Sequence, residues 1–163
     1  MIPKVDKQAL LTAFKAQLAA ELTRAKERAK DAADAATHVE NRAEGDKDMR
    51  ATEASYVARG HSERVFQLER AIVQLSSLQP PRLAEGDPIQ AGAVVCLEQQ
   101  TQRSWYFLIP VAGGQRVTLD GVQFQALTAQ SPLGAALLGL STDDEVEVTT
   151  PQGPRTSLVV SVQ

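Results

Sequence analysis

Apolar residues in the first half of the chain recur every three or four positions, which is the spacing of one helix face or of a coiled-coil seam. The first series consists of Leu11, Phe14, Leu18, Leu22, Ala25, Ala29, Ala32, Ala36 and Val39. The second consists of Ala51, Ala54, Ala58, His61, Val65, Leu68, Ile72, Leu75 and Leu78. Pro80 and Pro81 end it, because proline lacks an amide hydrogen and disfavours helix in the residue before it. The pattern predicts two long helices.

Residues 40–50 interrupt this pattern with acidic and basic side chains and with Gly45. Two helices of similar length that are joined by a short polar segment pack antiparallel. In that arrangement the large residues of the two series meet at one end, and the alanines meet near the connection. We therefore predict that residues 1–80 form an antiparallel coiled-coil hairpin with its tip near residues 40–50. Because alanine buries little apolar surface, the hairpin should be thin near its tip, which suits it to carrying a few side chains into a narrow cavity. The same pattern is equally compatible with a hairpin that serves as a dimerisation or scaffold element.

Beyond Pro81 the pattern changes to short apolar runs separated by turn residues, which is typical of β-strands. The runs are residues 94–97, 105–109, 117–119, 122–127, 146–148 and 158–162. Residues 81–163 are therefore predicted to form a second domain that is built on a small antiparallel sheet.

Turn and cap residues divide these runs. The Asp-Gly pair at 120–121 and the Pro-Gln-Gly-Pro segment at 151–154 predict two hairpin turns. Ser131 and Pro132 are suited to the N-cap and first position of a helix, and Gly139 to its end. One short helix is thus expected within the sheet domain, and the fold class is α+β.

The two parts also differ in charge. Up to Pro80 there are 13 Lys and Arg residues against 12 Asp and Glu, whereas the rest of the chain has 4 against 8 and no Lys. This contrast is typical of exposed helices joined to a compact domain. A formal net charge of −3 provides no global basic field for nucleic acid. No apolar run approaches the roughly 20 residues of a membrane span, so we expect a cytoplasmic protein with no membrane partner.

Few side chains outside the tip indicate chemistry. Cys96 is the one cysteine and lies in an apolar run, so we expect a buried apolar residue and no disulfide within the chain. His61 falls on the helical seam and is expected to pack between the helices. Trp105 and Tyr106 point to opposite faces of a strand, and at least one should pack in the core. Residues 81–163 contain no His and no Gly-rich phosphate loop, which favours a binding or docking module.

The second domain resembles the C-terminal domain of the bacterial Gre transcript-cleavage factors, GreA and GreB. The resemblance lies in residues 131–139 (Ser-Pro-Leu-Gly-Ala-Ala-Leu-Leu-Gly), 144–148 (Asp-Glu-Val-Glu-Val) and 151–153 (Pro-Gln-Gly). It implies an N-terminal coiled-coil hairpin followed by an FKBP-like sheet domain with one short helix. It also implies a transcription elongation factor of RNA polymerase. In that family the C-terminal domain docks at the rim of the polymerase secondary channel, and the hairpin reaches through the channel to the active centre.

The resemblance further implies a role for the acids of the tip. In the family, such acids help to hold a second Mg²⁺ ion and a water, and the polymerase then cleaves the RNA of a backtracked complex by two-metal hydrolysis. The candidates for this catalytic role are Glu40, Glu44, Asp46 and Asp48. Of these, Glu44, Asp46 and Asp48 are the candidate metal ligands. The factor alone is expected to be no enzyme: it shares Mg²⁺ with the polymerase, does not bind the ion stably by itself, and meets DNA and RNA only through the polymerase.

The tip also differs from the family pattern. Glu40-Asn41 followed by Glu44 resembles the family's Glu-Asn-x-Glu with one extra residue, and Lys47 stands where a second acid would be. Lys47 favours a second hypothesis, in which the protein enters the channel without stimulating cleavage and inhibits or modulates transcription. A third hypothesis is a coiled-coil adaptor with an FKBP-like domain. Prolyl isomerase activity is not expected, because one Trp, two Tyr and four Phe leave no evident FKBP aromatic pocket.

Overall fold

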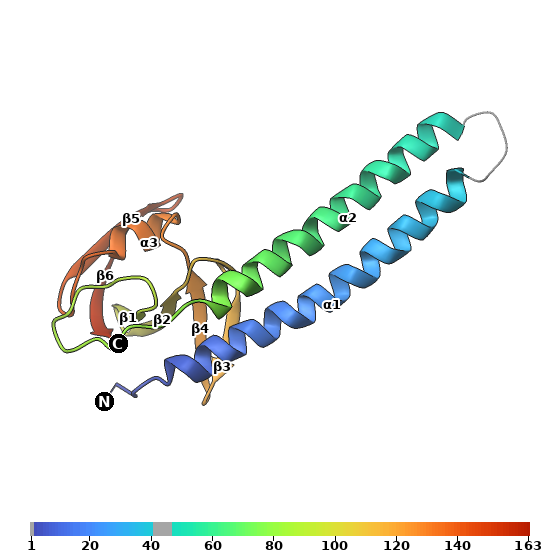
Figure 1. Ribbon diagram of the computed structural model, residues 1–163. Coiled ribbons are helices and arrows are strands. Elements are labelled where there is room, and N and C mark those ends of the chain that lie inside the picture. Colours follow the sequence, from blue (N-terminus) through green and yellow to red (C-terminus); the bar gives the residue numbers. More distant parts are fainter. Residues whose placement is uncertain (1, 41–46) are drawn as a thin grey trace. The chain divides into compact units, whose positions relative to one another are not determined.

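The computed structural model describes residues 2–40 and 47–163, and these form three helices and six strands (Figure 1). The elements are α1 Lys7–Glu40, α2 Lys47–Ser76, β1 Val94–Gln99, β2 Gln102–Leu108, β3 Arg116–Leu119, β4 Val122–Leu127, α3 Pro132–Leu137, β5 Glu145–Thr150 and β6 Gly153–Val162. Two long helices are thus followed by a sheet with one short helix, which confirms the predicted α+β fold class.

Two compact units divide the chain. One consists of residues 16–73, and the other joins residues 1–15 to residues 74–163. The first turns of α1 therefore belong to the unit that contains the sheet. The domain boundary predicted between residues 80 and 81 is not tested by this division and stays a prediction.

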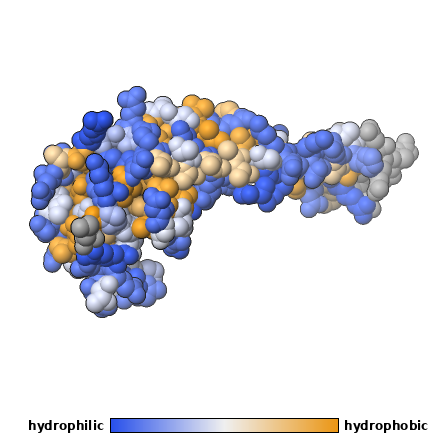
Figure 2. Space-filling model, turned by 90° about the horizontal axis from the view of Figure 1, so that it is seen from below, coloured by the Kyte–Doolittle hydropathy of each residue, from blue (hydrophilic) through white to orange (hydrophobic). Residues whose placement is uncertain are grey.

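The two long helices lie side by side and pack along the predicted seam (Figure 1). Every position of the two predicted series is buried or half-buried. Leu18, Ala25 and Leu68 are less than a twentieth exposed, and His61 is half-buried, as expected for a His between helices. On the face shown in Figure 2, hydrophilic residues predominate along the hairpin. The antiparallel hairpin is therefore confirmed.

Two ion pairs join the helices beside the seam. The Arg64 guanidinium donates a hydrogen bond to the Glu21 carboxylate, and Lys26 Nζ lies 3.4 Å from Glu69 Oε1. All four side chains are substantially exposed, so each pair contributes little to stability. Opposite charges at facing positions nevertheless favour this register of the helices over its neighbours.

Fewer residues separate the two helices than the gap in the apolar pattern predicts. The apolar series stop at Val39 and resume at Ala51, whereas α1 continues to Glu40 and α2 begins at Lys47. Lys, Met and Arg have high helix propensity, which explains why α2 begins before its first packed position. The connection is therefore shorter than the predicted tip of residues 40–50.

The sheet has the strand order β3-β4-β2-β1-β6-β5. Its neighbouring strands run antiparallel as predicted, with the exception of β2 and β4, which pair in parallel with Trp105 beside Phe124. The turn at 120–121 makes a hairpin of β3 and β4, as the Asp-Gly pair predicts, so β4 runs in the direction of β2. Because β4 rather than β3 lies next to β2, this pair is parallel. A turn signal predicts a hairpin, but it does not determine which of the two strands pairs with the rest of the sheet.

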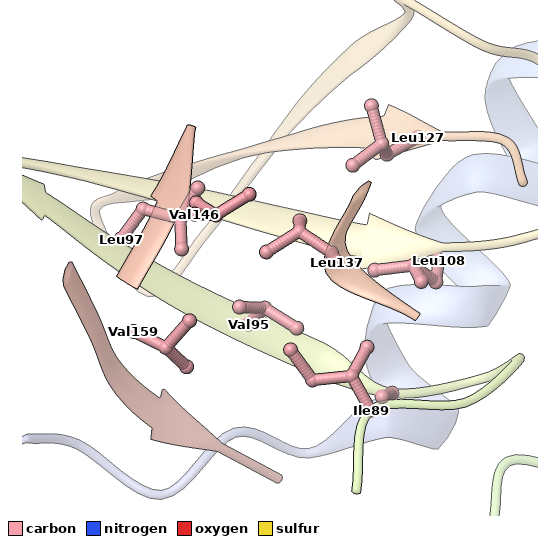
Figure 3. Packing of buried hydrophobic residues seen from close by; sticks show 9 residues of the cluster. Ile89, Val95, Leu97, Leu108, Leu127, Leu137, Val146 and Val159 are labelled. Carbon is pink, nitrogen blue, oxygen red and sulfur yellow. The ribbon is translucent and has the colours of Figure 1, made fainter. Parts of the chain in front are cut away.

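Apolar side chains cover both faces of the sheet. On one face a buried cluster packs against α3 (Figure 3). Its labelled members are Ile89, Val95, Leu97, Leu108, Leu127, Leu137, Val146 and Val159. On the opposite face the Phe107 ring lies 6.0 Å, between centroids, from the ring of Phe14 in α1. Successive strand residues point to opposite faces, so Cys96 shares this second face with Phe107 and is fully buried, as expected.

The first residues of the chain are bound to the sheet and to the segment after α2. The Asp6 carboxylate caps α1 by accepting hydrogen bonds of 3.0 Å from the N–H groups of Gln8 and Ala9. Lys7 Nζ donates to the Pro81 carbonyl, and burial lowers the pKa of Lys7. These contacts hold the start of α1 in the sheet-bearing unit.

Gln163 adds a second attachment of the N-terminal segment. Its side chain donates to the Pro3 carbonyl at 2.9 Å and accepts from the Val5 N–H at 2.8 Å. Its backbone N–H and carbonyl pair with those of Val94 at the start of β1, both at 2.8 Å. One side chain thus links residues that are separated by nearly the whole sequence.

α3 is short and is held by its cap. Ser131 Oγ accepts from the Gly134 N–H at 3.1 Å and donates to the Thr128 carbonyl at 2.7 Å, and Pro132 occupies the first helical position. Gly139 follows the helix with φ of +85°, a conformation that favours glycine. A Cβ at Gly134 would lie 2.0 Å from the Thr128 oxygen, so glycine is required there.

Gly134→Ala is expected to lower the free energy of unfolding by about 1–3 kcal/mol, because α3 or the Thr128 backbone must shift to admit a methyl group. Urea unfolding followed by circular dichroism measures the change. An unchanged unfolding midpoint would contradict the close approach of α3 to Thr128.

Gly60→Ala is the matched substitution with the opposite expected sign. Gly60 lies within α2, and a Cβ there would meet nothing within 4 Å. Replacing glycine by alanine inside an exposed helix should stabilise the hairpin by about 1 kcal/mol. The same unfolding measurement tests this, and a loss of stability would show that Gly60 is needed for a reason other than helix propensity.

Candidate functional site

The acids that the sequence singles out all belong to the connection between α1 and α2 or to the adjoining helix ends. Glu40 is the last residue of α1 and Asp48 is the second residue of α2. Glu44 and Asp46 lie outside the described residues, as do the side chains of Glu40 and Asp48. The catalytic and metal-binding roles of these four acids therefore stay predictions.

Two basic side chains near this connection are exposed. His38 lies in the last turn of α1, where a positive charge is favourable at the helix C-terminus, and Arg50 lies in the first turn of α2. Among the described residues, no group of three or more His, Cys, Asp or Glu side chains is arranged to hold a metal ion. The candidate metal ligands Glu44, Asp46 and Asp48 are not part of that set, because their side chains lie outside the described residues.

A hollow lies on the face of the sheet that carries α3. Its lining comes from β1, β2, α3, β5 and β6, and consists of Leu97, Gln99, Gln102, Ser104, Tyr106, Leu133, Val146, Val148, Thr150, Arg155 and Ser157. Apolar and neutral polar side chains predominate, with Arg155 as the charged group and no carboxylate or His in the lining. Such a lining offers apolar contacts and hydrogen-bonding groups to a bound molecule, and the docking module that the sequence predicts stays a prediction.

The two adjacent aromatic residues of β2 have different surroundings. Tyr106 packs against the apolar cluster of the α3 face. The Trp105 ring lies 5.7 Å from that of Phe124 in an edge-on contact. Both are half-buried, so the expected core role is confirmed. Arg155 was not singled out by the sequence, although its position in an alternating strand pattern is a signal that could have identified a lining residue.

Residues 84–163 match the family model described as transcription elongation factor, GreA/GreB, C-terminal. A curated protein of Sphingopyxis alaskensis, "Transcription elongation factor GreA", is 32% identical over 107 residues, which cover 62% of this chain and 65% of that protein. The match therefore spans somewhat less than two thirds of that relative.

Several solved structures are also similar to this chain. Gfh1, the GreA factor homolog 1 of Thermus thermophilus, is 26% identical, with 91% of this chain and 94% of that chain covered and a TM-score of 0.38. Gfh1 of Thermus aquaticus is 22% identical, with coverage of 93% and 95% and a TM-score of 0.41. A GreA/GreB factor of Nitrosomonas europaea is 19% identical, with coverage of 71% and 95% and a TM-score of 0.39.

The sheet domain that follows the two long helices is thus of the type found in transcription elongation factors. Residues 84–163 thus form the C-terminal domain of a GreA/GreB-type factor, and the chain is similar to the Gre family of transcription elongation factors. This confirms the resemblance found in residues 131–153.

In the described part of the chain, no helix has the length and apolar character that crossing a bilayer demands.

Cys96 is expected to be chemically inert in the folded protein. Burial raises the pKa of its thiol from the ordinary value of 9.0 to about 11. Iodoacetamide near neutral pH should therefore leave Cys96 unmodified in the native protein and modify it in denaturant, as mass spectrometry can show. Rapid native modification would contradict the burial.

The same pKa shift predicts a pH dependence of stability. Below pH 9 the thiol is protonated in both states, whereas between pH 9 and about 11 only the unfolded chain releases the proton, so stability falls as pH rises. Cys96→Ala removes this contribution. The stability difference between the wild type and Cys96→Ala should therefore shrink across that window, as measured by urea unfolding.

Proposed function

We propose that this protein is a transcription elongation factor that enters the secondary channel of bacterial RNA polymerase and stimulates cleavage of backtracked RNA. The observation that carries the proposal is the GreA/GreB family match of residues 84–163, on a chain whose preceding helices form a hairpin. The curated relative is itself named a transcription elongation factor. In this proposal the polymerase is the enzyme, and the protein is a regulatory factor without activity of its own.

The hairpin supports the proposal by its dimensions. α1 has 34 residues and α2 has 30, which at 1.5 Å per residue correspond to about 50 and 45 Å. The buried side chains between the helices become smaller toward the connection, from Leu18 and Leu68 to Ala25 and Ala36. A long pair of closely packed helices can carry the residues of its connection deep into a channel that excludes a globular domain.

The acids of the connection support the proposed chemistry by their type. Carboxylates are the hard oxygen ligands that Mg²⁺ prefers, and this ion usually keeps several ligands that a single protein segment does not supply. Glu44, Asp46 and Asp48 would hold the ion together with ligands of the polymerase, and Glu40 adds a fourth carboxylate to the segment. When bound, Mg²⁺ supplies activation of the attacking water and stabilisation of the leaving oxygen.

A second function is favoured by Lys47. This residue places a fixed positive charge among the acids of the connection, which opposes the binding of a cation there. Arg50, exposed one helical turn further along α2, adds a second positive charge. A factor of this kind would occupy the channel without stimulating cleavage and would inhibit or modulate transcription.

The experiment mixes the protein with stalled, backtracked RNA polymerase and follows the length of the RNA. The wild type is expected to shorten the RNA, and the variant with Glu44, Asp46 and Asp48 changed to Ala should leave it at the length seen without factor. The matched control changes Asp31, Asp34 and Glu53 to Ala. These are exposed acids elsewhere on the hairpin, so the charge change is equal, and the control should retain cleavage.

The outcomes separate the two functions. Competition with a known cleavage factor without any shortening of RNA would select the non-cleaving regulator, and Lys47→Glu should then restore some cleavage. Loss of cleavage in the control as well would show that overall charge, rather than the tip, is responsible. Absence of binding to polymerase would overturn both functions and leave an adaptor role. RNA that the factor shortens without polymerase would refute the regulatory assignment.

A further inference from the structure

α2 has a second line of large apolar side chains, outside the seam that faces α1. Met49 is 84% exposed, Tyr56 67%, Phe66 59% and Val73 69%. All four lie on α2, which has nearly all of the strongly exposed large apolar residues in the described part of the chain. Apolar side chains that gather on an exposed surface mark a site of interaction.

This line has the spacing of a coiled-coil seam. The four apolar residues fall into two columns along α2, and in each column the positions recur every seven residues. One column consists of Met49, Tyr56, Glu63 and Arg70, and the other of Thr52, Arg59, Phe66 and Val73. The columns are offset by three residues, so they lie side by side on the helix, and the steps between them alternate between three and four. We refer to these eight residues as the outer seam.

The outer seam is complementary to itself when two copies run antiparallel. A two-fold axis at the level of position 61 places Met49 opposite Val73 of a second copy and Tyr56 opposite Phe66. The same axis places Glu63 opposite Arg59, and Arg70 opposite the small polar Thr52. Each column thus meets the other column, which is how the two core positions pair in an antiparallel coiled coil.

The charges of the outer seam specify this orientation. In a parallel pair Arg59 would face Arg59 and Glu63 would face Glu63, whereas the antiparallel pair makes two opposite-charge contacts at its centre. Among the described residues neither Arg59 nor Glu63 forms an ion pair, so both are available. The guanidinium of Arg59 instead lies 6.0 Å from the Tyr56 ring centroid.

We propose that the outer seam is a self-association surface through which two copies of this chain form an antiparallel dimer. The occupant of the surface is a second copy because apolar and charged positions match simultaneously under one two-fold axis. At the lower end of the range for aromatic side chains, Tyr56 and Phe66 would bury about 600 Å² over both copies, and Met49 and Val73 would add to this, so the interface is small compared with typical specific interfaces. The dimer is accordingly weak, with dissociation in roughly the micromolar range. This inference is independent of the proposed function.

Sedimentation velocity of the full chain across the micromolar range tests the proposal. The wild type should show a concentration-dependent shift from monomer to dimer. Arg59→Glu and Glu63→Arg should each weaken the dimer by about tenfold or more, because each places like charges at the centre of the interface. The double variant, which exchanges the two charges, should restore the wild-type dissociation constant.

The control is Arg24→Glu, the same charge reversal at an exposed position of α1. It should leave the dissociation constant unchanged, and circular dichroism should show intact helices in every variant. A wild type that stays monomeric overturns the proposal. A dimer that Arg59→Glu leaves intact, or a double variant without recovery, also overturns it, since the dimer would then use another surface or register. No polymerase enters this assay, so its outcome is separate from that of the cleavage experiment.

Discussion

The packing of α1 against α2 through an unbroken three-four seam is the constraint on which the rest of the structure depends. Because Leu18, Leu68 and the small alanines between the helices are buried together, the helices must run antiparallel over their length. This brings Glu40, the last residue of α1, and Lys47, the first residue of α2, to the same end of the hairpin. It also determines which face of α2 stays exposed, so the apolar residues on that face are left to contact another molecule.

The sheet domain depends on a local constraint of another kind. α3 has only six residues, too few for an isolated helix to be stable, so it persists through its cap and its packing. Ser131 supplies the cap, Pro132 fixes the first turn, and Gly134 lets the helix approach the Thr128 carbonyl. These are the residues in which the resemblance to the Gre family is most apparent. The geometry of α3 accounts for these residue types.

Much of this fold could be predicted from sequence because its strongest signals are local. Helical periodicity predicts the seam of the hairpin, and turn residues predict the strand boundaries and α3. The parallel pairing of β2 with β4 could not be predicted, because it depends on which strand of the β3–β4 hairpin lies next to β2. The same holds for Gln163, whose contacts with Pro3 and Val5 span nearly the whole chain. At the tip, sequence predicts where the acids lie, but not how their oxygens are arranged, since no periodic packing determines it.

The change from leucine to alanine along the hairpin seam has a consequence for how the helices open. Apolar surface buried per turn declines from Leu18 toward Ala36, so each turn nearer the connection costs less free energy to separate. Opening therefore begins at the connection and proceeds toward the sheet, and backbone amides should exchange with solvent deuterium in that order. The turns of α1 and α2 nearest the connection can therefore separate while the turns nearer the sheet stay packed.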